Sequence, residues 1–115
     1  MKWPLIIRRV SGESMLPVLK PGQIVIGLAF GRLRPGRIVI ISHGGMEKIK
    51  RVGRIDGDKL YIIGDNAAAS TDSRQFGWIS RSQLTAVVVW PRAASRLDML
   101  EPESAKGNQD NERDA

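Results

Sequence analysis

The chain has 115 residues, a formal net charge of +6 and no cysteine. A chain of this length forms a single domain. Without cysteine it can have neither a disulfide nor a thiolate metal site. With one histidine, a zinc site would need mostly carboxylate ligands, which zinc sites seldom use. We therefore expect neither a metal nor another cofactor.

Charge is divided unevenly along the chain. Residues 1–95 carry a net charge of +9, whereas residues 96–115 carry −3. The stretch from Glu101 to Asp114 has only one alanine as apolar content, so it cannot offset the entropy of ordering and should be disordered. The expected organisation is one folded domain over residues 1–95 and a polar tail over residues 96–115.

The basic body can attract nucleic acid, anionic lipid or an acidic protein. No helix-turn-helix, zinc-finger or RNP-like pattern is present, so we expect no nucleic-acid partner. The apolar run Leu5–Ile7 is followed by two arginines and is far shorter than the roughly 20 residues of a membrane helix. No secretory signal pattern is present either. We expect a soluble, cytoplasmic protein, with Trp3 and Leu5 in the core of a first strand. The alternative is peripheral contact of Trp3 and Leu5 with a membrane interface.

Downstream, short runs rich in β-branched residues alternate with turn signals. Turns that contain Pro-Gly, Gly-Gly or Asp-Gly are expected at residues 20–22, 34–36, 44–45 and 56–58. The runs that we expect to form strands span residues 23–30, 37–42, 46–55, 59–63 and 84–90. This pattern predicts an all-β domain, a barrel-like arrangement of coiled sheet with short turns.

Ser14 lies in a turn that follows Gly12 and is stopped by Pro17. A serine hydroxyl is a poor nucleophile until a base takes its proton. His43 is the only histidine, and it lies at an expected hairpin tip, where nothing would orient it as Ser-His chemistry requires. A lysine is then the candidate base, because Ser-Lys pairs are a variant of the same chemistry.

Two lysines, Lys48 and Lys50, lie in the expected strand 46–55. A lysine that acts as a base at neutral pH needs a pKa lowered from about 10.4, and burial among apolar side chains lowers it. Ile49 and Val52 can supply such surroundings. Strand alternation puts both lysines on the same face, so their spacing does not choose between them.

Three motifs in this order resemble the conserved boxes of the type I signal peptidase family. They are Gly12–Pro17, Lys50–Val52, and a longer motif that joins Gly64–Asn66, Ser70–Arg74 and Phe76–Gly77. The resemblance extends from about Val10 to Pro91 and is greatest to the nickel-type superoxide dismutase maturation proteases. It implies the mainly-β fold that signal peptidases share with LexA-like self-cleaving proteins.

The resemblance implies Ser14 as the nucleophile and Lys50 as the base, because the family's base directly precedes the Arg-Val match. Ser70 matches the serine that hydrogen-bonds the base. Asp72 and Arg74 match a structural ion pair, expected to give support and not to transfer protons. The supporting set also includes Met15, near which shallow apolar substrate pockets are expected. Its other members are the turn residues Gly64, Asp65 and Asn66, which are expected to position the Ser70 loop.

Gly12 occupies a place where many bacterial signal peptidases have a serine whose hydroxyl helps to bind the oxyanion. The mitochondrial-type and LexA-like members resemble this chain in having glycine there. We therefore expect the oxyanion site to rest on the Ser14 N–H and another backbone donor.

The predicted function is that of a serine endopeptidase that removes a short N-terminal pro-segment from a precursor protein. In the subfamily that the chain most resembles, the precursor is a nickel superoxide dismutase. The substrate would bind in an extended conformation. One alternative is a LexA-like self-cleaving regulator, although only 13 residues precede Ser14. The other is a non-catalytic binding module that uses the basic surface.

Overall fold

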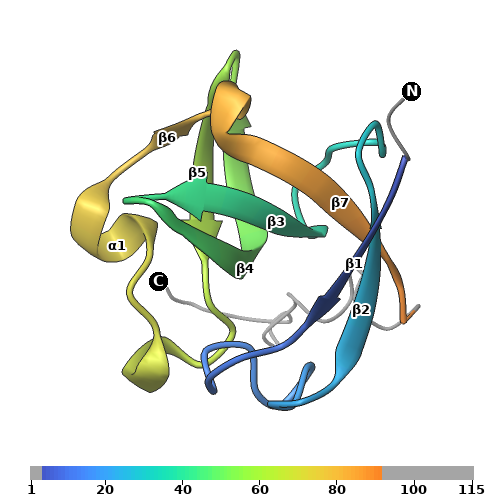
Figure 1. The fold of residues 1–115 in the computed structure, drawn as a ribbon. Coiled ribbons are helices and arrows are strands. Elements are labelled where there is room, and N and C mark those ends of the chain that lie inside the picture. Colours follow the sequence, from blue (N-terminus) through green and yellow to red (C-terminus); the bar gives the residue numbers. More distant parts are fainter. Residues whose placement is uncertain (1–3, 92–115) are drawn as a thin grey trace, which may run out of the picture.

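A computed structural model of the protein describes residues 4–91, which form one coiled antiparallel sheet (Figure 1). Its strands are β1 (Leu5–Arg9), β2 (Ile24–Leu28), β3 (Ile38–His43), β4 (Met46–Asp56), β5 (Lys59–Ile63), β6 (Ile79–Ser80) and β7 (Leu84–Trp90). The helices are short: η1 (Ala67–Ala69), α1 (Ser73–Phe76) and η2 (Arg81–Gln83). The prediction of an all-β fold is confirmed.

The order of the strands in the sheet is β1-β2-β7-β3-β4-β5-β6. Three strands therefore separate β1 from β4, yet Arg8 of β1 forms an ion pair with Glu47 of β4. The sheet thus coils back on itself and brings β1 opposite the first half of β4. That half, Met46–Lys50, pairs only with β3, because β5 pairs with β4 from Arg51 onward.

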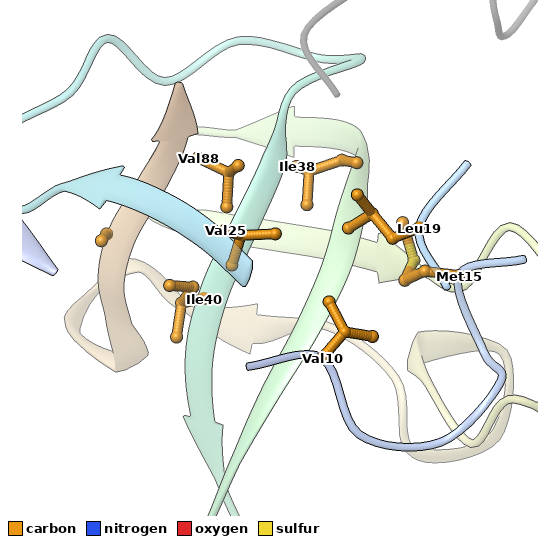
Figure 2. Packing of buried hydrophobic residues seen from close by; sticks show 8 residues of the cluster. Val10, Met15, Leu19, Val25, Ile38, Ile40 and Val88 are labelled. Carbon is orange, nitrogen blue, oxygen red and sulfur yellow. The ribbon is translucent and has the colours of Figure 1, made fainter. Parts of the chain in front are cut away.

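The central strand β3 is buried on both faces, which shows how the coiled sheet encloses its core. Ile38 and Ile40 belong to one apolar cluster (Figure 2). Val39 and Ile41, which alternate with them, belong to the other. Residues from neighbouring strands and from the Val10–Leu19 segment fill the first cluster, so the Ser14 turn is packed directly on the core.

The structure corrects one prediction for the N-terminal strand. Leu5 does not lie in the core, since 47 % of its surface is exposed. Its β1 neighbour Ile6 packs on the first cluster instead, because the two side chains point to opposite faces. Trp3 and the predicted tail, residues 96–115, lie outside the described residues.

The close packing of β2 against β7 gives a first testable prediction. A Cβ added at Gly27 would lie 2.9 Å from the Cβ of Ala86, so Gly27→Ala should lower the free energy of unfolding by about 1–3 kcal/mol. Gly53 is the matched control, because a Cβ there meets nothing closer than 3.4 Å. Urea unfolding should show a clearly larger loss for Gly27→Ala than for Gly53→Ala; equal losses would contradict the assigned packing.

Candidate active site

The Ser14 turn is anchored by its neighbour Met15. The Met15 side chain is 1 % exposed and packs within the first apolar cluster. Its carbonyl accepts a hydrogen bond from the Leu19 N–H, and Gly12 supplies the positive φ of 79° at the start of the turn. Ser14 itself is only partly buried. The buried Met15 side chain therefore holds the turn on the apolar core, while Ser14 remains accessible.

Asn66 holds the same turn from the other side. Its backbone N–H donates to the Ser14 carbonyl at 2.8 Å, and its side-chain Nδ2 donates to the Glu13 carbonyl at 3.1 Å. The two peptide carbonyls that flank the Ser14 N–H and Cα are thus bound to one residue. We expected Gly64–Asn66 to position the Ser70 loop; Asn66 in addition holds the Ser14 turn through these two hydrogen bonds.

Lys50 is the lysine that faces Ser70. Its side chain comes from β4, is 5 % exposed, and donates from Nζ to Ser70 Oγ at 2.8 Å. Lys48 points instead toward Phe76, with Nζ 5.6 Å from the centre of that ring. The contacts thus distinguish the two lysines, which the alternation of the strand could not do.

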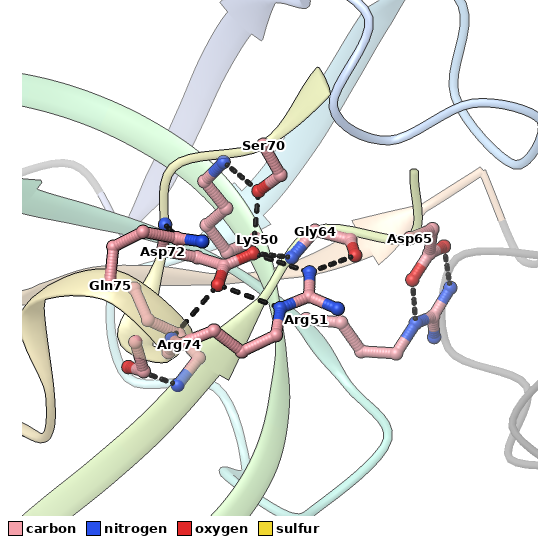
Figure 3. A network of polar contacts seen from close by, with 10 residues as sticks. Lys50, Arg51, Gly64, Asp65, Ser70, Asp72, Arg74 and Gln75 are labelled. Atoms are coloured by element: carbon pink, nitrogen blue, oxygen red, sulfur yellow. Dashed lines mark hydrogen bonds and ion pairs between the residues drawn. The ribbon is translucent and has the colours of Figure 1, made fainter. Parts of the chain in front are cut away.

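The hydrogen bond between Ser70 and Asp72 determines which group donates in the contact between Lys50 and Ser70. Ser70 Oγ donates to Asp72 Oδ2 at 2.6 Å, so its only proton is committed to the carboxylate (Figure 3). The Lys50 amine must therefore donate to Ser70. A neutral amine held in this way keeps its lone pair free to take a proton from another group.

The Asp72 carboxylate is the centre of the network. It is fully buried and also accepts hydrogen bonds from the Gly64 N–H and from the backbone and guanidinium of Arg74. Burial alone would raise the pKa of Asp72, but the hydrogen bonds from Arg74, Ser70 and Gly64 outweigh it and hold that pKa well below its usual range. Asp72 and Arg74 form the predicted ion pair, with Nη2 and Oδ2 2.7 Å apart.

The pKa of Lys50 is lowered mainly because burial removes water from the ammonium group. The negative charge of Asp72 acts in the opposite direction, and the positive charges of Lys48 and Arg74 reinforce the lowering. The residues around Lys50 therefore favour its neutral form, the one that can accept a proton.

Gly64 and Asp65 make contacts that the sequence did not specify. A Cβ on Gly64 would lie 2.3 Å from Ser70 Oγ and 2.8 Å from the Ser14 carbonyl, so only glycine fits between them. Asp65 binds the guanidinium of Arg51 through two hydrogen bonds of 2.7 Å. Arg51 is fully buried and also donates to the Gly36 carbonyl. The Lys50–Val52 motif contained this arginine, but its partner could not be predicted from the sequence.

Ser14 and Lys50 both line a groove of about 280 Å³. Its walls come from β1 and the turn that follows it, from the first half of β4, and from the loop around Ser70. Ser14 Oγ and Lys50 Nζ make no hydrogen bond with each other in this structure; catalytic contacts are often long before substrate binds. The lining residues are Arg8–Met15, Met46–Lys50, Ala69 and Thr71.

His43 is better held than the sequence indicated. Its ring stacks on Phe76 with centroids 4.0 Å apart, and Nδ1 lies 3.3 Å from Gln83 Nε2. We expected nothing to orient His43, and that expectation was wrong, because both contacts come from residues distant in the chain. The ring is not part of the groove lining, so the structure gives it no role beside Ser14.

A family model described as Peptidase S24-like matches residues 3–87. The chain belongs to the Peptidase S24-like family. Membership of this family, which contains serine peptidases and LexA-like proteins, agrees with the all-β fold and with the resemblance to signal peptidases. No curated protein matches the sequence. Among residues 4–91, no helix is long and apolar enough to cross a membrane, and no group of three or more His, Cys, Asp or Glu side chains could hold a metal ion.

The burial of Lys50 gives a prediction about stability. Because its pKa is lowered in the folded state, the unfolded chain binds the proton more tightly, and stability rises with pH toward the ordinary lysine pKa of about 10.4. Lys50→Met keeps the side-chain length and removes the buried ionisable amine. It should raise the free energy of unfolding at pH 7 by about 1 kcal/mol, and the gain should shrink toward pH 10.

Denaturant unfolding of both proteins at the two pH values measures this difference. Lys59→Met is the matched control, because Lys59 is an exposed strand lysine and should change stability by less than about 0.5 kcal/mol. A Lys50→Met variant less stable than the wild type at pH 7 would show that the ammonium of Lys50 stabilises the fold.

Proposed function

We propose that the protein is a serine endopeptidase in which Ser14 is the nucleophile and Lys50 is the general base. The observation that carries this proposal is the directed chain of hydrogen bonds from Lys50 to Ser70 to Asp72. This chain orients the amine and leaves its lone pair unused, in a groove that Ser14 also lines. A buried lysine with a lowered pKa beside a serine is the arrangement that Ser-Lys hydrolysis requires.

In the proposed reaction, Ser14 Oγ attacks the scissile carbonyl while its proton passes to Lys50 Nζ. The resulting ammonium gives a proton to the leaving amine as the peptide C–N bond breaks, which leaves an acyl ester on Ser14. Lys50 then takes a proton from water, whose oxygen attacks the ester. As the ester C–O bond breaks and the acid product leaves, the Lys50 ammonium returns the proton to Ser14 Oγ. Ser70 and Asp72 orient the amine and exchange no proton with substrate.

The oxyanion of this reaction needs a donor, and the Ser14 N–H is available. Among residues 4–91 it donates to no backbone carbonyl. It belongs to the same peptide group as the Glu13 carbonyl, which Asn66 Nδ2 binds. In a trans peptide the N–H and C=O point in opposite directions. The Asn66 contact therefore directs the Ser14 N–H away from the Gly64–Asn66 turn, where it can meet a developing oxyanion.

An extended peptide fits the proposed substrate groove. The free edges of β1 and of the first half of β4 face the groove with unpaired backbone groups, to which an added strand can hydrogen-bond. The resemblance to signal peptidases supports small side chains before the cut and a short N-terminal pro-segment as the part removed. By the same resemblance, we propose a nickel superoxide dismutase precursor as the substrate.

The activity is tested by incubating the full-length protein with this precursor and following the precursor's mass. Loss of the leader should be abolished by Ser14→Ala and by Lys50→Met, because each removes one member of the proposed pair. The kcat/KM of the wild type should rise with pH and level off above the lowered pKa of Lys50. Cleavage that survives either substitution would contradict the assignment of the nucleophile or the base.

The two alternative functions give different results in the same assay. A self-cleaving regulator of the LexA type would shorten its own chain and leave the precursor intact. A non-catalytic basic module would cut neither protein and would bind polyanions in a strongly salt-dependent way.

The role of Asn66 gives a separate kinetic prediction. Asn66→Ala removes the Nδ2 donor to Glu13 without adding a charge, so kcat should fall by about tenfold with little change in KM. The midpoint of the pH profile should not move, because Lys50 and its partners are untouched. Gln23→Ala is the matched control, because it removes a side chain whose Oε1 accepts from the Lys20 N–H outside the groove. A fall in kcat as large in the control would remove the argument for Asn66.

A further inference from the structure

An ion pair crosses the proposed substrate groove from one edge to the other. Arg8 of β1 and Glu47 of β4 both line the groove, and their side chains form two hydrogen bonds, from Nε to Oε1 and from Nη2 to Oε2. The two side chains are 42 % and 36 % exposed. Exposed ion pairs stabilise a fold little, so this pair can exchange partners at low cost.

The guanidinium of Arg8 also occupies a backbone group that a substrate strand would use. Nη1 donates to the Ile7 carbonyl at 2.9 Å. Backbone groups along a strand alternate between its two edges, and the carbonyls of Pro4 and Val10 accept hydrogen bonds from residues that flank β2. The Ile7 carbonyl, an odd number of residues from both, therefore points to the free edge of β1. A peptide that pairs with this edge must displace Arg8 from that carbonyl.

The ion pair lies a short way along the groove from the proposed chemistry. Glu47 and Lys50 are three residues apart on β4, which is about 10 Å at the rise of a strand. β1 likewise leads from Arg8 toward the Ser14 turn. In an extended peptide that pairs with both edges, about the third residue from the scissile bond is then level with Arg8 and Glu47.

The other charges of the groove decide which substrate side chain fits at this level. Arg9 and Lys48 also line the groove, and within residues 4–91 neither forms an ion pair. A substrate cation that bound Glu47 would leave Arg8 without an anion in a groove that these cations line. A substrate carboxylate that bound Arg8 would instead release Glu47 into a groove that has cations to spare. An acidic substrate side chain is therefore favoured over a basic one.

We propose that Arg8 is a specificity-determining residue, which binds an acidic side chain about three residues from the scissile bond of the substrate. The substrate carboxylate replaces Glu47 on the guanidinium, and the substrate backbone replaces Arg8 on the Ile7 carbonyl. This role rests on the proposed peptidase function, since both use the same groove. It narrows the substrate class to extended peptides that carry an acidic residue at this position.

Capture of random decapeptides on immobilised full-length protein with Ser14→Ala tests the proposal. This substitution removes the proposed nucleophile, so that bound peptides stay uncut. Mass spectrometry of the captured peptides should show Asp and Glu enriched about fivefold over Lys and Arg, relative to the unselected library. Adding Arg8→Gln should remove most of this enrichment. Adding Glu47→Gln should increase it, because the carboxylate that competes for Arg8 is gone.

Arg54→Gln is the matched control for the loss of one positive charge. Arg54 is exposed and lies against Tyr61 and Trp78, outside the groove lining, so the enrichment should persist in this variant. Equal enrichment with and without Arg8→Gln would overturn the proposal, and so would capture of no peptide. An equal loss in Arg54→Gln would also overturn it, by assigning the enrichment to the basic surface as a whole.

The same proteins separate this proposal from the proposed function. Cleavage of the precursor by the wild type, without acidic enrichment in the capture, would overturn the role of Arg8 and leave the peptidase assignment in place. Acidic enrichment that depends on Arg8, without cleavage of the precursor, would support the binding role of Arg8 and count against that precursor as the substrate.

Discussion

The hydrogen bond from Ser70 to the buried carboxylate of Asp72 is the interaction on which the proposed chemistry depends. A serine hydroxyl has one proton, and here that proton is directed to Asp72 at 2.6 Å. If the hydroxyl turned, it could donate to the lone pair of Lys50 and occupy the position that a base must keep free. Arg74 and the Gly64 N–H compensate the buried charge of Asp72, so the carboxylate stays ionised and holds Ser70 in place.

The coiling of the sheet brings the network of Lys50, Ser70 and Asp72 close to Ser14. The Ser14 turn follows β1, and Lys50 lies on β4, with three strands between β1 and β4 in the sheet order. Coiling brings the two opposite each other, and the Gly64–Asn66 turn bridges them. Gly64 fits between Ser70 and the Ser14 carbonyl only because it has no side chain, while Asn66 binds both carbonyls of the turn. The proposed nucleophile, the proposed base and the residues that orient this base are thereby joined at one turn.

The same coiling leaves the sheet unevenly covered. β3 is buried on both faces because the sheet wraps around it, whereas Leu5 and Ile7 on the outward side of β1 are exposed among the residues that the structure describes. The other side of β1 faces the groove, which Arg8 lines.

The sequence by itself determined the strands other than the two-residue β6 and most of the turns, because β-branched runs and Pro-Gly or Gly-Gly turns act through local backbone preferences. It also singled out Ser14, and by family resemblance Lys50, Ser70 and the Asp72–Arg74 pair. Choosing Lys50 over Lys48 from the residues alone was impossible, since alternation places both on one face. The resemblance chose Lys50, and the physical distinction came from the tertiary structure, which places Ser70 beside one amine and Phe76 beside the other.

The two wrong expectations have the same physical origin. Leu5 was expected in the core and His43 was expected to be unsupported, yet Leu5 is exposed and His43 stacks on Phe76. Alternation along a strand tells which residues share a face, but not whether that face is covered. The cover comes from segments distant in the chain, and the way that the sheet coils decides where those segments lie.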